Sequence, residues 1–117
     1  MVARRRIDPV EGRAALAAWH AGASDRATLA AAVRFTLEEV AARAPGNSVE
    51  VRVPPYGVAQ CVPGPRHTRG TPPNVIECDA GTWLMLVTGR LAWAEAVAAG
   101  SVAASGLRAD LAHLLPL

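Results

Sequence analysis

The sequence predicts a small α+β fold, with one antiparallel or mixed sheet of four to five strands and helices packed on one face. Strand-like patterns cluster in the middle of the chain, and helical patterns flank this cluster on both sides. The connections between the strand patterns are mostly short, which favours antiparallel or mixed pairing. Because 117 residues suit one domain, we expect residues 1–117 to form a single domain, with a flexible basic segment at 1–7 and a helical part at 8–45.

The first predicted helix follows a strong start signal. Asp8 can cap the helix, and Pro9 suits the first helical position. The helix continues to about His20, and Gly22 ends it.

A second helix begins after Ser24 and Asp25 and stops at residues 45–47. Apolar residues recur in it every three or four positions, which is typical of a helix with one buried face. This apolar stripe consists of Leu29, Val33, Leu37 and Val40, and Arg34, Glu38 and Arg43 lie off it.

The strand patterns begin where the helical pattern ends. Residues 49–53 alternate valine with charged side chains, which predicts a half-buried strand, and residues 57–62 predict a second strand. Residues 63–74, rich in proline, glycine, threonine and arginine, predict a loop. A third strand is expected at 75–78.

The C-terminal third alternates short elements. Asp79 caps a predicted helix that Gly89 ends, and a short helix is expected at 93–99. A strand of small residues at 101–105 and a last helix at 109–115 complete the pattern.

The composition excludes several classes of protein. With 51% hydrophobic and 19% charged residues the chain is not of a disordered type, and no apolar run reaches the ~18 residues of a membrane span. The formal charge of +2 does not imply nucleic acid. The basic start is followed by Ile7-Asp8-Pro9 rather than an apolar stretch, which argues against a secretory signal, so we expect a cytoplasmic protein.

No residue pattern predicts catalysis, a metal site or a cofactor. His20, His67 and His113 are widely spaced, and Cys61 and Cys78 have no ligand spacing and are expected to be buried, reduced thiols. Whether the two thiols touch stays open. The sequence also lacks a nucleophile elbow and a phosphate-binding loop, so we expect no enzyme and no catalytic residue.

Two basic stretches are candidate contacts for anions. Arg66, His67 and Arg69 lie in the proline-stiffened loop, where arginine forks could bind a carboxylate or phosphate. The alternative is a solvated connection with local salt bridges. For Arg4-Arg5-Arg6 we favour a solvated tail over a contact with anionic lipid or nucleic acid.

The C-terminal third also contains many large apolar residues for its length. The ordinary interpretation is that these residues form the hydrophobic core. The more specific interpretation is that they line a pocket between the C-terminal helices and the sheet.

The order of motifs in this region resembles a known family. From Val49 to Leu117 the chain resembles the bacterial branch of the sterol carrier protein family. It is also similar to the C-terminal domains of mycothiol-dependent maleylpyruvate isomerase-like proteins. The residues that carry the resemblance are Glu77-Cys78-Asp79, Thr82-Trp83-Leu84, Thr88-Gly89-Arg90-Leu91, Trp93-Ala94-Glu95-Ala96, Ala99-Gly100, Ser105-Gly106 and Ala109-Asp110-Leu111. The chain departs from the family pattern at 63–73, where proline-rich sequence replaces a plain strand and turn.

The resemblance implies a sheet covered by helices, with an apolar cavity for fatty-acyl or other lipid ligands. By position, the cavity wall corresponds to Trp83, Leu84, Val87, Trp93, Val97, Leu111, Leu114 and Leu115.

The leading hypothesis is therefore non-catalytic binding of a lipid or another apolar small molecule. The alternatives are a protein–protein interaction module, or an accessory domain of a thiol-dependent isomerase or transferase in which Arg66 and Arg69 bind a substrate carboxylate. We expect no nucleic-acid partner and no stable membrane insertion. A protein partner and a dimer both stay open.

Overall fold

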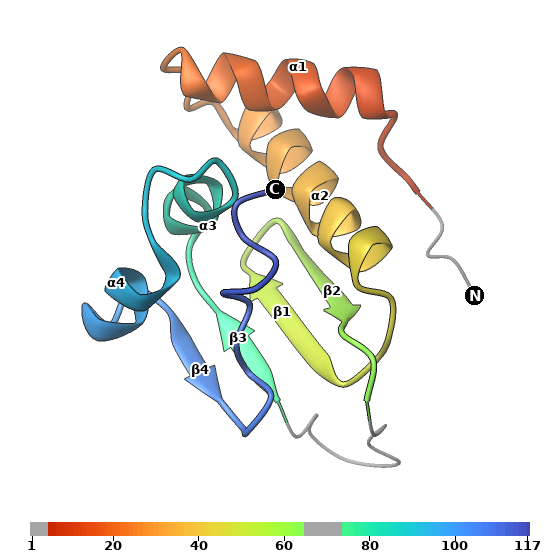
Figure 1. Ribbon diagram of the computed structural model, residues 1–117. Coiled ribbons are helices and arrows are strands. Elements are labelled where there is room, and N and C mark those ends of the chain that lie inside the picture. The colour runs from red at the N-terminus through yellow and green to blue at the C-terminus, as the bar shows by residue number, and fades with distance from the viewer. Residues whose placement is uncertain (1–4, 65–73) are drawn as a thin grey trace.

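The structure is a computed structural model and describes residues 5–64 and 74–117. Two helices come first, followed by most of the strands, and a second pair of helices precedes the last strand (Figure 1). The elements are α1 (Pro9–His20), α2 (Arg26–Arg43), β1 (Val49–Val53), β2 (Gly57–Cys61), β3 (Val75–Glu77), α3 (Ala80–Val87), α4 (Trp93–Ala98) and β4 (Ala103–Ser105).

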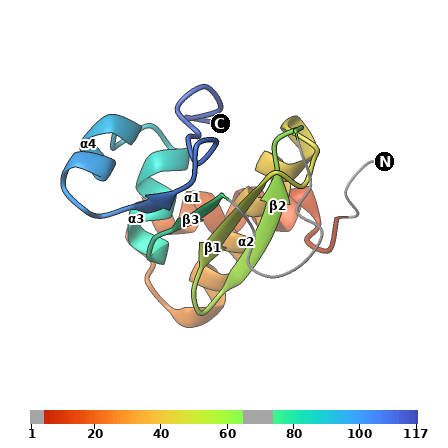
Figure 2. The same ribbon diagram turned by 90° about the horizontal axis from the view of Figure 1, so that it is seen from below.

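The four strands form one mixed sheet in the order β2-β1-β3-β4. β1 pairs antiparallel with β2 and parallel with β3, and β3 pairs antiparallel with β4. Seen from below, β2 and α4 lie at opposite sides of the molecule (Figure 2). The predicted α+β class with a mixed sheet is confirmed.

One face of the sheet carries the core. Val49, Val51 and Val53 of β1 are fully buried, whereas Glu50 and Arg52 between them are only half-buried. Successive side chains of a strand point to opposite faces, so the valines share one face with Ala59 and Ile76, which pair with Val51. The core extends from this face to buried side chains of α2 and α3.

Each of the three longer helices begins at an aspartate. The capping carboxylates accept a backbone N–H in the first turn, which satisfies a donor that the helix itself cannot pair. The pairs are Asp8 with Val10, Asp25 with Thr28, and Asp79 with Thr82. The predicted starts of these helices are therefore confirmed.

Helices α1 and α2 touch at a glycine. A Cβ atom added to Gly12 would lie 2.2 Å from Cγ of Phe35, so no other residue fits there without a shift of the phenyl ring. This close approach brings the first part of α1 near the middle of α2, and the two helices lie next to each other in Figure 1.

The predicted last helix at 109–115 is wrong. The described chain forms turns there, with the N–H of Leu114 donating to the carbonyl of Leu111 and the Asp110 carboxylate accepting from Ala112. Pro116 disfavours helical geometry at the residue before it, and a helix of two turns is marginal without packing on a continuous face. The chain instead folds back, and the N–H of Leu117 donates to the carbonyl of Val87.

None of the helices in the described ranges combines the length and the apolar character that crossing a membrane requires.

Candidate ligand groove

An open groove of about 710 Å³ lies between α2 and the edge strand β2. The N-terminal residues that precede α1 complete one of its walls. Its lining residues are Arg6, Ile7, Arg34, Leu37, Glu38, Ala41, Tyr56, Gly57, Val58, Ala59 and Gln60.

Helix α2 contributes one stripe of side chains to the groove. Arg34, Leu37, Glu38 and Ala41 follow the spacing of three and four residues that places helical side chains on one face. Leu37 belongs both to this stripe and to the buried core, so the floor of the groove is continuous with the core.

Strand β2 forms the opposite wall. Within the described ranges it pairs only with β1, so its outer edge faces the groove side of the molecule. Val58 of β2 is 58% exposed, a large value for a valine in a strand. The Arg34 guanidinium donates from Nε to the carbonyl of Tyr56 at 2.8 Å, which ties α2 to the turn between β1 and β2.

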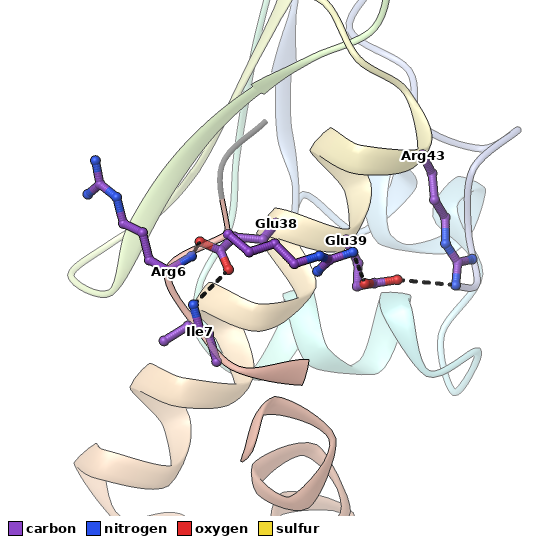
Figure 3. A network of polar contacts seen from close by, with 6 residues as sticks. Arg6, Ile7, Glu38, Glu39 and Arg43 are labelled. Carbon is purple, nitrogen blue, oxygen red and sulfur yellow. Dashed lines mark hydrogen bonds and ion pairs between the residues drawn. The ribbon is translucent and has the colours of Figure 1, made fainter. Parts of the chain in front are cut away.

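The third part of the groove is the N-terminal strap, which we define as residues 5–8. The Glu38 carboxylate accepts the backbone N–H of Arg6 at 2.7 Å and that of Ile7 at 3.1 Å (Figure 3). The neighbouring Glu39 carboxylate pairs with the Arg5 guanidinium. Two adjacent glutamates of α2 therefore hold the strap against the helix.

The groove combines apolar side chains with an excess of positive charge. Ile7, Leu37, Ala41 and Val58 supply apolar surface, and the guanidinium groups of Arg6 and Arg34 outnumber the Glu38 carboxylate. Chemically, this arrangement suits a molecule with an apolar body.

A second, shallower groove of about 440 Å³ lies between α1 and the end of α3. It is lined by Arg13, Leu16, Ala17, His20 and Thr88. It has fewer lining residues and is wider open to solvent than the groove between α2 and β2, so it offers a ligand less enclosure.

The residues predicted to line a cavity lie elsewhere. Trp83, Leu84, Val87 and Leu111 are buried in the core; Trp93, Leu114 and Leu115 are partly buried and pack against it; Val97 is 41% exposed. None of them lines either of the two grooves. Their role as a ligand wall stays a prediction, and Arg66, His67 and Arg69 lie outside the described residues.

The sequence contained no specific signal for the groove. Arg34 and Glu38 stand four residues apart on α2 and off the main apolar stripe, which is the ordinary pattern of a solvated face. Only the return of β2 beside α2 turns that face into a groove wall. A contact this distant in sequence is not readable from helical periodicity.

The two cysteines are free and buried, as expected, and lie on separate sides of β1 in the sheet order. Burial raises the pKa of the Cys61 thiol to about 11. Burial, and then the charges of Asp79 and Glu77, raise the pKa of the Cys78 thiol to about 12. Neither thiol is therefore activated as a nucleophile at neutral pH. Within the ranges that the structure describes, no three histidine, cysteine, aspartate or glutamate side chains gather as metal ligands would.

A family model described as "Bacterial SCP ortholog" matches residues 25–117. The comparison with curated proteins found no match. The matched region begins at the N-cap of α2 and includes the whole sheet, whereas α1 and the N-terminal strap precede it.

Proposed function

The chain belongs to the family of bacterial SCP orthologs, which are sterol carrier protein-like domains, and on this premise we propose that it binds a lipid or another apolar small molecule in the groove between α2 and β2. The binding is non-catalytic, and residues 1–117 act as one such domain.

The observation that carries the proposal is the groove itself. Its volume of about 710 Å³ lies within the ~300–1,000 Å³ that is usual for small-molecule sites. Apolar side chains come from three separate parts of the chain, namely Ile7, the α2 residues Leu37 and Ala41, and the β2 residue Val58. An apolar ligand placed there would remove from water the surface of Val58, which is 58% exposed, and of the partly exposed Ile7, which favours binding. Leu37 and Ala41 are already buried and would offer mainly contact to the ligand.

The energy needed to open a site also favours the groove over the C-terminal core. Trp83, Leu84 and Leu111 have no exposed surface, so a cavity among them has to be created. At ~24 cal/mol per Å³, an empty cavity of ~300 Å³ costs ~7 kcal/mol, against a total stability of ~5–15 kcal/mol for a typical domain. The groove is open already and carries no such cost.

Two exposed valines allow a matched test. Val58 lies on the groove, and Val97, a predicted wall residue in α4, does not. Each is replaced by serine, and binding of dansyl-undecanoate is followed by its fluorescence. We expect V58S to weaken binding roughly tenfold, because burial of two methyl-sized groups contributes about 1.6 kcal/mol, and V97S to bind like the wild type.

The reverse result, in which only V97S weakens binding, would move the site to the C-terminal cavity wall that the family resemblance implied. If neither the wild type nor any variant binds the probe, the proposal of apolar ligand binding fails altogether.

A second candidate function, a protein-interaction module, is favoured by the open edge of β2. The N–H of Glu50 and the carbonyl of Arg52 bond toward the β3 side. Gln60 pairs with Glu50 and Val58 pairs with Arg52, and these two pairs exchange no backbone hydrogen bonds between β1 and β2. The backbone N–H and carbonyl groups of Val58 and Gln60 therefore point outward from the sheet edge. An extended peptide could add there as a further strand. Slower amide exchange of Val58 and Gln60 in the presence of a protein partner would support this function, and unchanged exchange would argue against it.

A further inference from the structure

We propose that the N-terminal strap and α2 together select the head group of the ligand, and that the ligand is an amphiphile with one negatively charged head group. Arg6 and Arg34 bind the head group, while the apolar part lies over Ile7, Leu37 and Ala41. This inference rests on the proposed function and names the ligand class of the same site.

Arg6 is held in the strap through its backbone N–H, which leaves its side chain unbound by the part of the chain that the structure describes. Both carboxylate oxygens of Glu38 are used by backbone N–H groups, Oε2 by Arg6 and Oε1 by Ile7. In Figure 3 the Arg6 side chain extends away from Glu38. Within the described ranges the Arg6 guanidinium forms no ion pair, so its donors are available to a ligand.

Arg34 is positioned by a different contact. Its Nε–H donates to the Tyr56 carbonyl, and the side chain is exposed. This hydrogen bond uses one of the five N–H donors of the guanidinium. It holds the planar group in place and leaves the terminal N–H groups free to contact an anion. Arg34 likewise forms no ion pair within the described residues.

The charges of the groove therefore favour an anion. Two guanidinium groups and one carboxylate line it, and that carboxylate already accepts two N–H groups. Guanidinium groups bind carboxylates and phosphates with the same fork geometry, so the shared chemistry is a single anionic head group. Arg34 lies within the residues that match the family model, whereas the strap precedes them, so the contribution of Arg6 comes from a part of the chain that the family match does not cover.

The test displaces dansyl-undecanoate from the full chain with four competitors that share one alkyl chain: dodecanoate, dodecyl phosphate, dodecanol and dodecyltrimethylammonium. We expect the two anions to bind roughly threefold to tenfold more tightly than dodecanol, as solvent-exposed ion pairs allow, and the cation to bind most weakly. Tighter binding of dodecanoate than of dodecyl phosphate, or the reverse, identifies which anion the site prefers.

Two variants locate the selectivity, and a third controls for charge. R6Q and R34Q should each reduce the preference for anions over dodecanol, whereas R26Q removes the same charge from an α2 residue outside the groove and should leave the preference unchanged. The inference is overturned if dodecanol binds as tightly as the anions, or if R26Q acts like R6Q. In either case bound dodecanol still supports apolar binding, whereas failure of all four competitors and of the probe would defeat the proposed function as well.

Discussion

A single hydroxyl joins α2 to α3 inside the core. Trp83 Nε1 donates to Thr36 Oγ1 at 2.8 Å, and Thr36 Oγ1 lies 2.8 Å from the Ala32 carbonyl that it donates to. Both side chains are fully buried, so the indole N–H has no access to water. The hydroxyl satisfies this donor, and that is why a polar residue is retained among apolar neighbours.

Replacing Thr36 by valine should therefore be costly although the volume is conserved. The indole N–H loses its acceptor, and a buried unsatisfied donor costs about 1–3 kcal/mol in the free energy of unfolding. Urea denaturation measures this loss. Thr88, whose hydroxyl bonds only to carbonyls of its own helix α3, provides the control, and T88V should cost less than T36V. Equal stability of T36V and the wild type would contradict this account of the pair.

The buried thiols predict a dependence of stability on pH. The folded-state pKa is raised to about 11 for Cys61 and about 12 for Cys78, from an ordinary value of 9.0. A raised pKa means that the stabilising contribution is complete below pH 9 and is lost as the pH rises toward the folded-state values. We expect the free energy of unfolding to fall above pH 9, and to fall less in a C61A/C78A variant. Equal slopes for both proteins would contradict the prediction.

At the same scale, the caps and turns were readable from the sequence. Asp8, Asp25 and Asp79 begin helices, and Gly89 adopts a positive φ value of 80° just after the end of α3, as its position predicted. These are local signals, decided by the backbone chemistry of a few adjacent residues.

Among the elements, α1 depends on one close contact. Because a Cβ on Gly12 would overlap Phe35, G12A forces the two helices apart and should cost about 1–3 kcal/mol, measured by thermal or urea unfolding. Gly81 is the matched control, since its added Cβ would meet nothing nearer than 3.8 Å. G81A should instead stabilise by up to about 1 kcal/mol through helix propensity. If both variants behaved alike, the Gly12–Phe35 contact would not be the cause.

Elements with one strong pattern could be predicted, and those without could not. The alternation in β1 is confirmed, and Val33, Leu37 and Val40 of the predicted α2 stripe are buried. Phe35, which lies off that stripe, is also buried, because α1 covers a second face of α2. The segment at 109–115 had the leucines of a helix, yet its fold depends on Pro116 and on the contact between Leu117 and Val87. The N-terminal strap had no periodic signal at all, because its position depends on Glu38 and Glu39, more than thirty residues away.

At the scale of the whole molecule, the fold class was predictable but the sheet order was not. Short connections indicated a mixed or antiparallel sheet, yet the parallel pairing of β1 with β3 places β2 at an edge. That edge position produces the groove beside α2. The candidate site therefore depends on strand order, whereas the apolar wall predicted from the resemblance followed residue type alone.

The central claim, that an apolar ligand lies between α2 and β2, is tested most directly by nuclear magnetic resonance with a spin-labelled dodecanoate. The label broadens the amide signals of residues close to the bound ligand. We predict broadening at Leu37, Ala41, Val58 and Ala59, with the signal of Val97 unchanged. Broadening centred on Val97 and residues 114–117, with the signals of α2 and β2 unaffected, would contradict the account.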